Sequence, residues 1–421
     1  MRKAVLTGIA VVFLIPLLSS CDTGARELDA RSYVYTIGVD KGVSDLLRFT
    51  FQFPALSGQL GKEGGGGSPK AKTGSDLSVI TIDCATIYGG IELIYSSYSR
   101  RLDLTHAKFL IISEELARES VEPFINGMTR SSEIRRSMYV IVAKGTAMDF
   151  INEFKPFAGA SVAKSQEMFM ENSEQSALYE SVFYNSFANR LKCTKCQATA
   201  TLAALNDFSN FKESGRRTEE FISEGDYYPG EMPRRSENKF EFLGMAIFSG
   251  GKMVGELSGN ETRSMLLLRG TYKESQMVVP DPEDSSLRVG ALVFQKHKPK
   301  IKITFEEGRP KIHAAVFLEG SLQNVQNTGI DDEARRTQLE EAFEEFIKEK
   351  LDQTVKKCRE LNCEVFDFGY KAARQFWTIQ DWEKFDWLSS FKNAEVTTEV
   401  QLIMRRTGTI IFTEADKKAQ E

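Results

Sequence analysis

Lys108-Phe109-Leu110-Ile111-Ile112-Ser113 is the stretch that decides the fold class of this chain of 421 residues. Its apolar run is short, which predicts a buried strand, and the residues from Glu114 onward have a helical pattern. The same order recurs at residues 137–143, a second predicted strand, before a helix through Phe150 and Phe154. Alternating strands and helices predict an α/β layer structure rather than separate all-α and all-β pieces.

The upstream residues predict a hairpin, a loop, a strand and a helix. Residues 31–40 predict a buried strand that ends in a turn at Asp40-Lys41-Gly42, and residues 47–53 alternate strictly as the second arm. The stretch 57–74 contains four consecutive glycines (64–67) and predicts a flexible surface loop. A phosphate-binding loop is excluded because no Gly-Lys-Ser/Thr ending precedes a helix. Residues 77–83 then predict a strand and residues 86–98 a helix.

The middle of the chain predicts helix, a polar connection and a second hairpin. Residues 163–191 predict mostly helix, with a break near Asn172-Ser173. Residues 206–238 are polar and predict a long exposed connection. Strands at 240–248 and 253–257 form the hairpin, and a capping box from Ser258 to Glu261 begins a helix over 262–268.

The last third predicts a sheet and one long helix. Strands are expected at 276–279, 287–295, 300–305, 311–318 and 395–405. The helix spans 331–359, and one of its faces carries Leu339, Phe343, Phe346, Ile347, Leu351 and Val355. A coiled coil is the alternative, but a single helix between strands more often packs on a sheet.

We therefore predict an α/β (α+β) protein of three domains, each a mixed or antiparallel sheet packed with helices, after a cleaved lipoprotein signal. The expected segments are a signal peptide at 1–20, an N-terminal α/β domain at 21–192, a middle domain at 193–285 that includes the polar linker 206–238, and a C-terminal domain at 286–415 with an antiparallel sheet and the long helix 331–359.

The first 21 residues predict a lipid attachment site. Arg2 and Lys3 precede an apolar run that is too short for a comfortable membrane span, and Leu18-Ser19-Ser20-Cys21 supplies small residues before a cysteine. This order resembles a bacterial lipobox, in which the cysteine receives a diacylglyceryl group and becomes the new N-terminus. An ordinary secretory signal is the alternative. We expect a body tied to the membrane by lipid at Cys21, with no second membrane segment.

The other cysteines and the net charge limit the kinds of site that the chain can contain. Cys193-Thr194-Lys195-Cys196 has the spacing of redox and metal sites, but no second such pair accompanies it, so metal binding by Cys193 and Cys196 is a weak expectation beside a local disulfide or no role. The full chain has 54 basic residues, and removal of the signal takes away Arg2 and Lys3. The remaining 52 basic and 59 acidic residues give a net charge of −7. Nothing indicates nucleic-acid binding, which favours a basic face.

No catalytic signature or cofactor site is present, so we expect no enzyme. The carboxylate pairs Asp331-Asp332 and Glu344-Glu345 are interpreted as solvated charges on a helix. An aromatic cluster contains Phe376, Trp377, Trp382, Phe385 and Trp387, and predicts a satellite core under the long helix rather than a stacking site for sugar or peptide.

The whole chain resembles the Ger(x)C spore germination lipoproteins, the C subunits of nutrient germinant receptors. The similarity rests on blocks that follow the order of the family's pattern: Cys21 with Arg26-Glu27-Leu28, Thr36 to Gly42, the glycine run, His106 with Lys108 and Ile111 to Ala117, Phe242 to Phe248, Val254 to Leu257, Glu261 to Arg263, Ile312-His313, Val365 to Gly369, Trp382 to Trp387, and Arg405 to Gly408. Residues 192–238 have no strong counterpart, so no role for Cys193 or Cys196 follows from the family.

The resemblance implies three α/β domains and a lipid anchor on the outer face of the spore inner membrane. It also implies assembly with an A-type multi-pass subunit and a transporter-like B-type subunit, and no enzymatic activity. The expected function is protein–protein interaction in germination signalling. The alternative is a lipid-anchored extracytoplasmic protein that binds a small molecule itself, with a pocket near the tryptophans. Partner contact predicts exposed apolar surface, first sought at Phe242 to Phe248 and Val365 to Gly369, although most residues of these blocks are interpreted as core strands.

Overall fold

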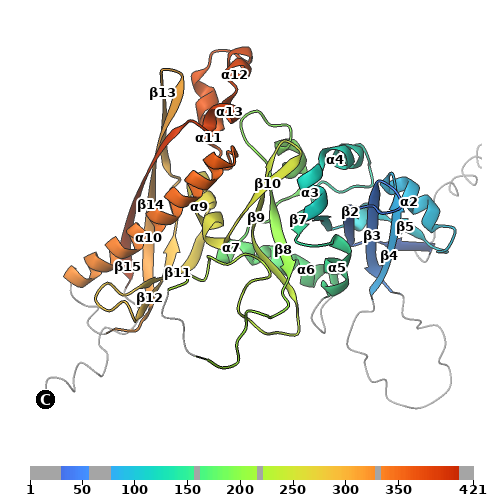
Figure 1. Cartoon of the computed structure of the whole chain (residues 1–421), viewed down its shortest axis with the longest axis horizontal. Helices are drawn as coiled ribbons and strands as arrows, with labels where there is room; N and C mark the ends of the chain where they lie inside the picture. The colour runs from blue at the N-terminus through green and yellow to red at the C-terminus, as the bar shows by residue number, and fades with distance from the viewer. Residues whose placement is uncertain (1–29, 56–76, 156–161, 216–220, 328–332, 407–421) are drawn as a thin grey trace, which may run out of the picture.

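The structure, a computed structural model, describes residues 30–55, 77–155, 162–215, 221–327 and 333–406 (Figure 1). Cys21, the signal segment, the glycine run and the pair at 331 and 332 lie outside the described residues. Three sheets are present in the described part, with two, eight and five strands. Helices and mixed sheets together make an α+β protein, as the sequence predicts.

The eight-stranded sheet has the order β10-β9-β8-β7-β6-β2-β3-β4. Its strands are β2 (Thr36–Lys41), β3 (Leu47–Pro54), β4 (Leu77–Cys84), β6 (Phe109–Ser113), β7 (Tyr139–Ala143), β8 (Thr199–Leu205), β9 (Phe240–Ser249) and β10 (Lys252–Leu257). The four central strands β2, β6, β7 and β8 run parallel, and antiparallel pairs continue on both sides. Central parallel strands are buried on both faces, which explains why Phe109 to Ile112 is continuously apolar and fully buried.

This sheet crosses the first predicted domain boundary. β7 precedes the position 192/193 and β8 follows it, yet the two strands pair in parallel at Ile141↔Thr201 and Ala143↔Ala203. The N-terminal and middle segments therefore share one sheet, and β9 and β10 extend it further. Residues 206–215 and 221–239 contain no helix or strand, as expected of a connection, but it is not exposed throughout, because Asn206 and Ser223 are buried.

Helices on this part of the chain follow local signals. They are α2 (Ile87–Ile94), α3 (Glu114–Glu119), α4 (Glu122–Thr129), α5 (Ala147–Glu153), α6 (Val162–Glu171), α7 (Ser173–Ser176), α8 (Tyr184–Arg190) and α9 (Gly259–Arg269), with a short 3₁₀ turn η2 (Leu104–His106). The predicted capping box is confirmed, because the Ser258 side chain accepts from the Glu261 N–H and the Glu261 carboxylate from the Ser258 N–H. The predicted helix over 163–191 is wrong at 177–183, because α7 ends at Ser176 and the next residue, Ala177, lies in the left-handed region (φ 51°).

The five-stranded sheet holds β11 (Glu274–Pro280), β12 (Arg288–Phe294), β13 (Lys300–Glu306), β14 (Arg309–Val325) and β15 (Glu395–Arg406). Strands β11 to β14 pair antiparallel, but β14 and β15 pair parallel, so the expected antiparallel sheet is mixed. Parallel neighbours need a crossover connection, and α10 (Glu333–Glu360) with the helices that follow it forms that crossover. A short parallel pair of β1 (Arg31–Tyr33) and β5 (Arg101–Asp103) forms the smallest sheet.

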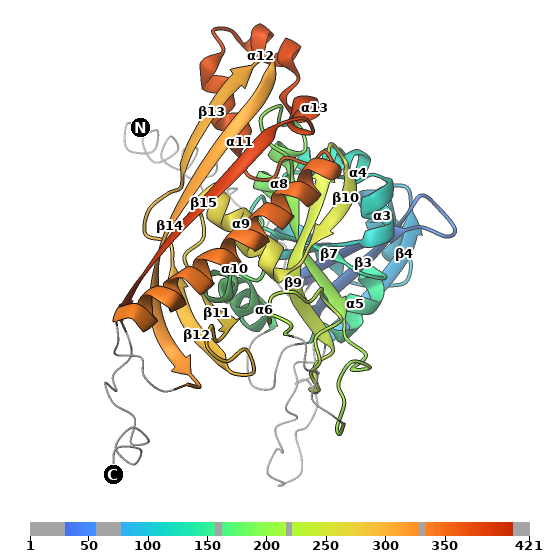
Figure 2. The same cartoon turned by 60° about the vertical axis from the view of Figure 1, so that its left-hand side comes forward.

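Helix α10 runs along β15, as Figure 2 shows. Five of the six predicted face residues are buried: Leu339, Phe343, Ile347, Leu351 and Val355. Phe346 is half-buried. The helix packs on a sheet rather than in a coiled coil, and among the described residues no helix has the length and apolarity needed to cross a membrane.

The segment after α10 folds into α11 (Phe368–Ala372), the 3₁₀ turn η3 (Ala373–Gln375), α12 (Ile379–Phe385) and α13 (Trp387–Phe391). Trp382 and Trp387 are buried and stack with ring centroids 5.9 Å apart, which confirms their place in a core. Trp377 is 99% exposed and does not belong to that core, contrary to the prediction. It lies between η3 and α12, where the chain turns away from the aromatic cluster.

Candidate functional site

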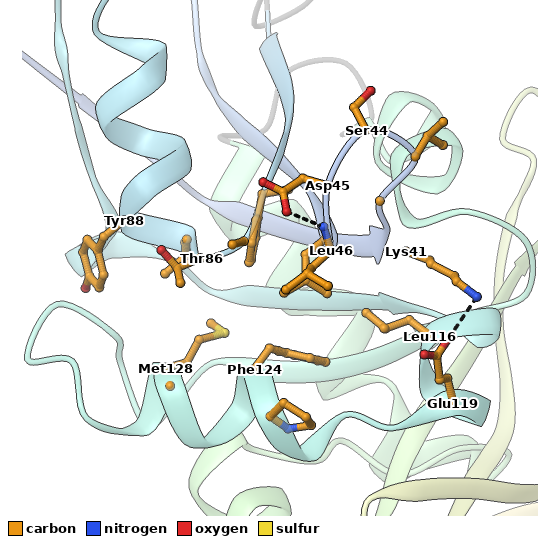
Figure 3. Close-up of a pocket in the computed structure, with 18 residues that line it drawn as sticks. Lys41, Ser44, Asp45, Leu46, Thr86, Tyr88, Leu116, Glu119, Phe124 and Met128 are labelled. Carbon is orange, nitrogen blue, oxygen red and sulfur yellow. Dashed lines mark hydrogen bonds and ion pairs between the residues drawn. The ribbon is translucent and has the colours of Figure 1, made fainter.

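A cavity of about 1010 Å³ lies at one end of the eight-stranded sheet (Figure 3). Three segments enclose it: the β2–β3 connection and the start of β3 (41–47 and 49), the start of α2 (85–88), and the helices α3 and α4 (116–128). We call it the N-terminal groove, lined by Lys41, Gly42, Val43, Ser44, Asp45, Leu46, Leu47, Phe49, Ala85, Thr86, Ile87, Tyr88, Leu116, Glu119, Pro123, Phe124, Gly127 and Met128.

The floor of the groove belongs to the protein core. Phe49, Ile87, Leu116, Phe124 and Met128 are all at least nine-tenths buried. Each points inward because it occupies the apolar position of a strand or helix that packs on this end of the sheet. The floor is therefore rigid and apolar.

The rim of the groove carries apolar side chains that remain in solvent. Val43 is 81% exposed, Leu46 73% and Tyr88 42%. Leu46 from the β2–β3 connection and Phe124 from α4 face each other across the groove (Figure 3). Exposed apolar residues are common singly, but a cluster beside an apolar hollow marks a contact surface.

The β2–β3 connection is held in place by Asp83 on the neighbouring strand β4. Its carboxylate accepts the backbone N–H groups of Val43 (3.1 Å) and Ser44 (2.8 Å) and two hydrogen bonds from Arg48. The hydrogen bond from Arg48 and those from the two backbone groups hold the pKa of Asp83 well below its usual range. Asp83 therefore stays ionised and fixes the loop that presents Val43 and Leu46.

Charged groups stand at one corner of the groove. Lys41 Nζ lies 3.0 Å from Glu119 and 3.7 Å from Glu115, and its hydrogen bond to Glu119 raises the pKa of Lys41. One ammonium group thus faces two carboxylates, which leaves a net negative charge at this corner beside the apolar floor.

A second hollow of about 490 Å³ adjoins the first at the carboxyl ends of β2, β6 and β7. Ligands of open α/β sheets often bind at such ends. Here Asp40 already accepts the N–H groups of Ala147 (2.7 Å) and Met148 (3.0 Å) at the start of α5, and burial raises the pKa of Asp40 against these hydrogen bonds. The basic groups Arg48 and Arg118 are paired with Asp83 and Glu114. These charged side chains therefore stabilise the fold.

The predicted site residues have different outcomes. Cys21 lies outside the described residues, so lipidation stays a prediction. Cys193 and Cys196 form a disulfide, and a disulfide sulfur is not the thiolate that binds metal. Among the described residues, no group of three or more His, Cys, Asp or Glu side chains could hold a metal ion.

The two blocks proposed first for partner contact belong to the core. Phe242 to Phe248 forms most of β9, and Phe242 is 9% exposed. Val365, Phe366 and Phe368 are at most 1% exposed. The groove has no signature in the sequence, because its three walls come from segments far apart in the chain. The one available signal was Val43 and Leu46, two large apolar residues inside a predicted turn.

Comparison with known families covers most of the chain. Residues 24–205 match the family described as "Spore germination protein N-terminal domain", and residues 243–408 match "Spore germination B3/GerAC like, C-terminal". The chain belongs to the GerC-like family of spore germination proteins. The polar connection at 206–238 lies between the two matched regions of this GerC-like chain.

Relatives of this GerC-like protein match it in sequence or in fold. Spore germination protein B3 of Bacillus subtilis (strain 168) is 23% identical over 257 residues, 60% of each chain. A B. subtilis protein that bears a spore germination name, YfkR, is 21% identical over 418 residues, 98% of this chain and 99% of its own. The crystal structure of the GerBC protein matches with a TM-score of 0.52 and 17% identity, covering 88% of this chain and 97% of GerBC. At that identity the match shows the shared fold.

Proposed function

We propose that this GerC-like chain is a lipid-anchored subunit of a spore nutrient germinant receptor that acts by binding the membrane subunits of the receptor. The family match over residues 24–205 and 243–408 is the observation that carries the proposal. The partners are an A-type and a B-type membrane subunit. The site of action is the outer face of the spore inner membrane, and no enzymatic activity is required of the chain.

The N-terminal groove is the surface proposed for partner contact. Its rigid apolar floor and its exposed Val43 and Leu46 suit an apolar segment of a membrane subunit outside the bilayer. Lys41 beside it is already paired with Glu115 and Glu119, so an acidic peptide gains little there. The groove thus supports binding to an apolar protein segment more than capture of an anion.

Lipid at Cys21 supplies the tether. An acyl chain contributes about 0.8 kcal/mol per buried methylene, and two or more chains hold a protein stably on a bilayer. Anchoring also raises the local concentration of the chain near membrane partners, which strengthens a modest contact without new interactions.

A Cys21→Ala variant of the full chain tests this proposal in spores. The variant is expected to leave the membrane fraction and to lose the nutrient response together. Thr23→Ala, which keeps the cysteine and its preceding small residues, serves as the control. A normal nutrient response from an unanchored Cys21→Ala chain would contradict the proposal.

Binding of a small molecule by the chain itself is the second candidate, and the groove volume is the observation that favours it. The tryptophan cluster offers less room, because Trp382 and Trp387 stack on each other in the core. Calorimetry of the purified chain with amino acids and sugars separates the candidates. If one nutrient gives a heat of binding, and Leu46→Asp abolishes that heat, small-molecule binding is favoured. If no nutrient in a broad panel gives a heat of binding, partner binding is favoured.

A further inference from the structure

The loop Cys193-Thr194-Lys195-Cys196 connects α8 to β8 and is closed by a disulfide. Cys196 is fully buried and Cys193 is half-buried, so one sulfur end faces the surface. The other cysteines of the described residues, Cys84, Cys358 and Cys363, are buried free thiols. Burial raises the pKa of all three thiols, which makes them inert at neutral pH. Redox chemistry in the described part of the chain is therefore concentrated at this loop.

We propose that the Cys193–Cys196 disulfide is a site of thiol–disulfide exchange with a dithiol reductant, and that its state controls the docking of α11 and α12 on the loop. The C-x-x-C spacing is the spacing of exchange sites in redox proteins. The proposal concerns a surface distant in sequence from the N-terminal groove and does not depend on the partner proposed for that groove.

Tyr370 on α11 is placed to assist the exchange. Its hydroxyl lies 3.2 Å from Cys196 Sγ and 3.7 Å from Cys193 Sγ. A disulfide sulfur has no proton, so the tyrosine O–H is the donor. When Cys196 leaves as a thiolate, the same hydroxyl stabilises the new negative charge, because a hydrogen bond to a charged acceptor is stronger than one to a neutral acceptor. Tyr370 is 45% exposed, which leaves the contact open to solvent.

The exchange takes place in two balanced steps. A thiolate of the reductant attacks Cys193 Sγ, the S–S bond breaks, and Cys196 leaves as a thiolate that takes up a proton. The second thiol of the reductant then attacks its own sulfur in the mixed disulfide and releases the Cys193 thiolate, which is protonated in turn. The reductant ends as a disulfide, and the loop ends as two thiols that have gained two electrons and two protons.

The loop is also where the C-terminal helices meet the eight-stranded sheet. Trp382 Nε1 on α12 donates to Thr194 Oγ1 at 3.2 Å. A Cβ on Gly369 of α11 would lie 2.1 Å from the Lys195 carbonyl oxygen, so this helix contacts the loop backbone directly. Both contacts are made by the two residues between the cysteines. Opening the disulfide gives these residues new backbone freedom and therefore loosens both contacts.

A purely structural staple is the competing interpretation. A disulfide stabilises the fold mainly by closing a loop of the unfolded chain, and the benefit grows with the length of the loop. Cys193 and Cys196 are only three positions apart in sequence, so the entropic benefit is at the low end. The half-buried Cys193 and the aimed Tyr370 hydroxyl are features that a staple does not need.

Reduction kinetics of the full chain, purified in detergent, test the assignment of Tyr370. Alkylation and mass spectrometry follow the loss of the disulfide in dithiothreitol. Tyr370→Phe is expected to slow the reduction about fivefold, the effect of one hydrogen bond of about average strength. Tyr227→Phe, a half-buried tyrosine elsewhere, is the matched control and should leave the rate unchanged. Equal rates for wild type and Tyr370→Phe, or free Cys193 and Cys196 thiols in the purified chain, overturn the proposal.

Hydrogen exchange tests the coupling to the C-terminal helices. Reduction of the wild-type chain is expected to raise the exchange of residues 366–385 at least several-fold. The Cys193→Ser/Cys196→Ser variant should show the raised exchange with or without reductant. Unchanged exchange in a wild-type chain whose disulfide is verified as open overturns the coupling. The wild-type comparison stands even where the double variant fails to fold.

Discussion

Arg48 Nε lies 2.6 Å from Asp83 Oδ1, and Arg48 Nη2 lies 3.1 Å from Asp83 Oδ2, across the neighbouring strands β3 and β4. The same carboxylate accepts the N–H groups of Val43 and Ser44. One side chain thus connects a strand pair to the loop that presents the exposed rim of the N-terminal groove. The geometry of the groove depends on the charge of Asp83.

Asp83→Asn should therefore loosen the β2–β3 connection. The amide loses the charge that Arg48 and two N–H groups share, and hydrogen bonds to a charged group contribute about 1.5–3 kcal/mol. Hydrogen exchange at residues 42–46 is expected to rise, while Glu92→Gln, an exposed carboxylate on α2, leaves it unchanged. Unaltered exchange in Asp83→Asn would show that the loop is held by other contacts.

The pH dependence of this loop has a definite sign. The folded pKa of Asp83 is lowered, first by the hydrogen bond from Arg48, below the ordinary value of 3.8. A lowered pKa gives stability that is present above the unfolded pKa and is lost as pH falls through the folded pKa. Protection of residues 42–46 should thus persist at pH 4 and fail only in stronger acid.

The ion pair between Arg335 and Asp281 joins the start of α10 to the β11–β12 connection. Arg335 Nη2 lies 2.6 and 2.5 Å from the two carboxylate oxygens, and both side chains are at least 95% buried. Arg335→Ala should lower the free energy of unfolding by about 3–5 kcal/mol, because it leaves Asp281 as an uncompensated buried charge. Urea unfolding measures this, with the partly exposed neighbour Arg336→Ala as control. A loss no larger than that of the control would refute the assignment.

Two glutamates of α10 protect the free edge of β15. Glu344 Oε1 accepts the Leu402 N–H and Glu340 Oε1 accepts the Met404 N–H, each at 2.7 Å. Unpaired strand edges promote association between chains. Glu340→Ala/Glu344→Ala should therefore self-associate in light scattering, whereas Glu340→Gln/Glu344→Gln, which retains both acceptor oxygens, should stay closer to wild type. Identical scattering from both double variants would show that the two glutamates do not protect this edge.

Glu364 predicts a second pH effect, at the base of α11. Burial, followed by the nearby charge of Asp367, raises the pKa of Glu364 to about 7 against hydrogen bonds from Phe366, Phe368 and Gly369. A raised pKa gives stability that is fully present below the unfolded value of 4.5 and is lost as pH rises through about 7. Urea unfolding between pH 5 and 8 should show this fall, and Glu364→Gln should flatten it. Parallel profiles for the two proteins would contradict the prediction.

The sequence predicts elements better than it predicts their pairing. Period and caps are local properties, so the hairpin around Gly250, the capping box at Ser258 and the buried face of α10 were predicted correctly. The joining of β7 to β8 across the predicted boundary at 192/193 depends on burial between distant segments. The exposure of Trp377 has the same origin, because composition places it among aromatic residues while the turn before α12 directs it to solvent.

The candidate sites show the same division. Spacing identified Cys193 and Cys196 as a pair, but only the fold places Tyr370 beside their sulfurs. The N-terminal groove has no sequence motif, because the walls that carry Leu46, Tyr88 and Phe124 meet only after folding.

Affinity purification from spore membranes tests the central claim most directly. The tagged wild-type chain should retain an A-type and a B-type membrane subunit. Val43→Asp/Leu46→Asp, which places two charges on the groove rim, should remain in the membrane fraction yet lose at least one of them, whereas Trp377→Ala at the distant exposed tryptophan should retain both. Absence of both subunits from the wild-type preparation, or their full retention by Val43→Asp/Leu46→Asp, would contradict this account.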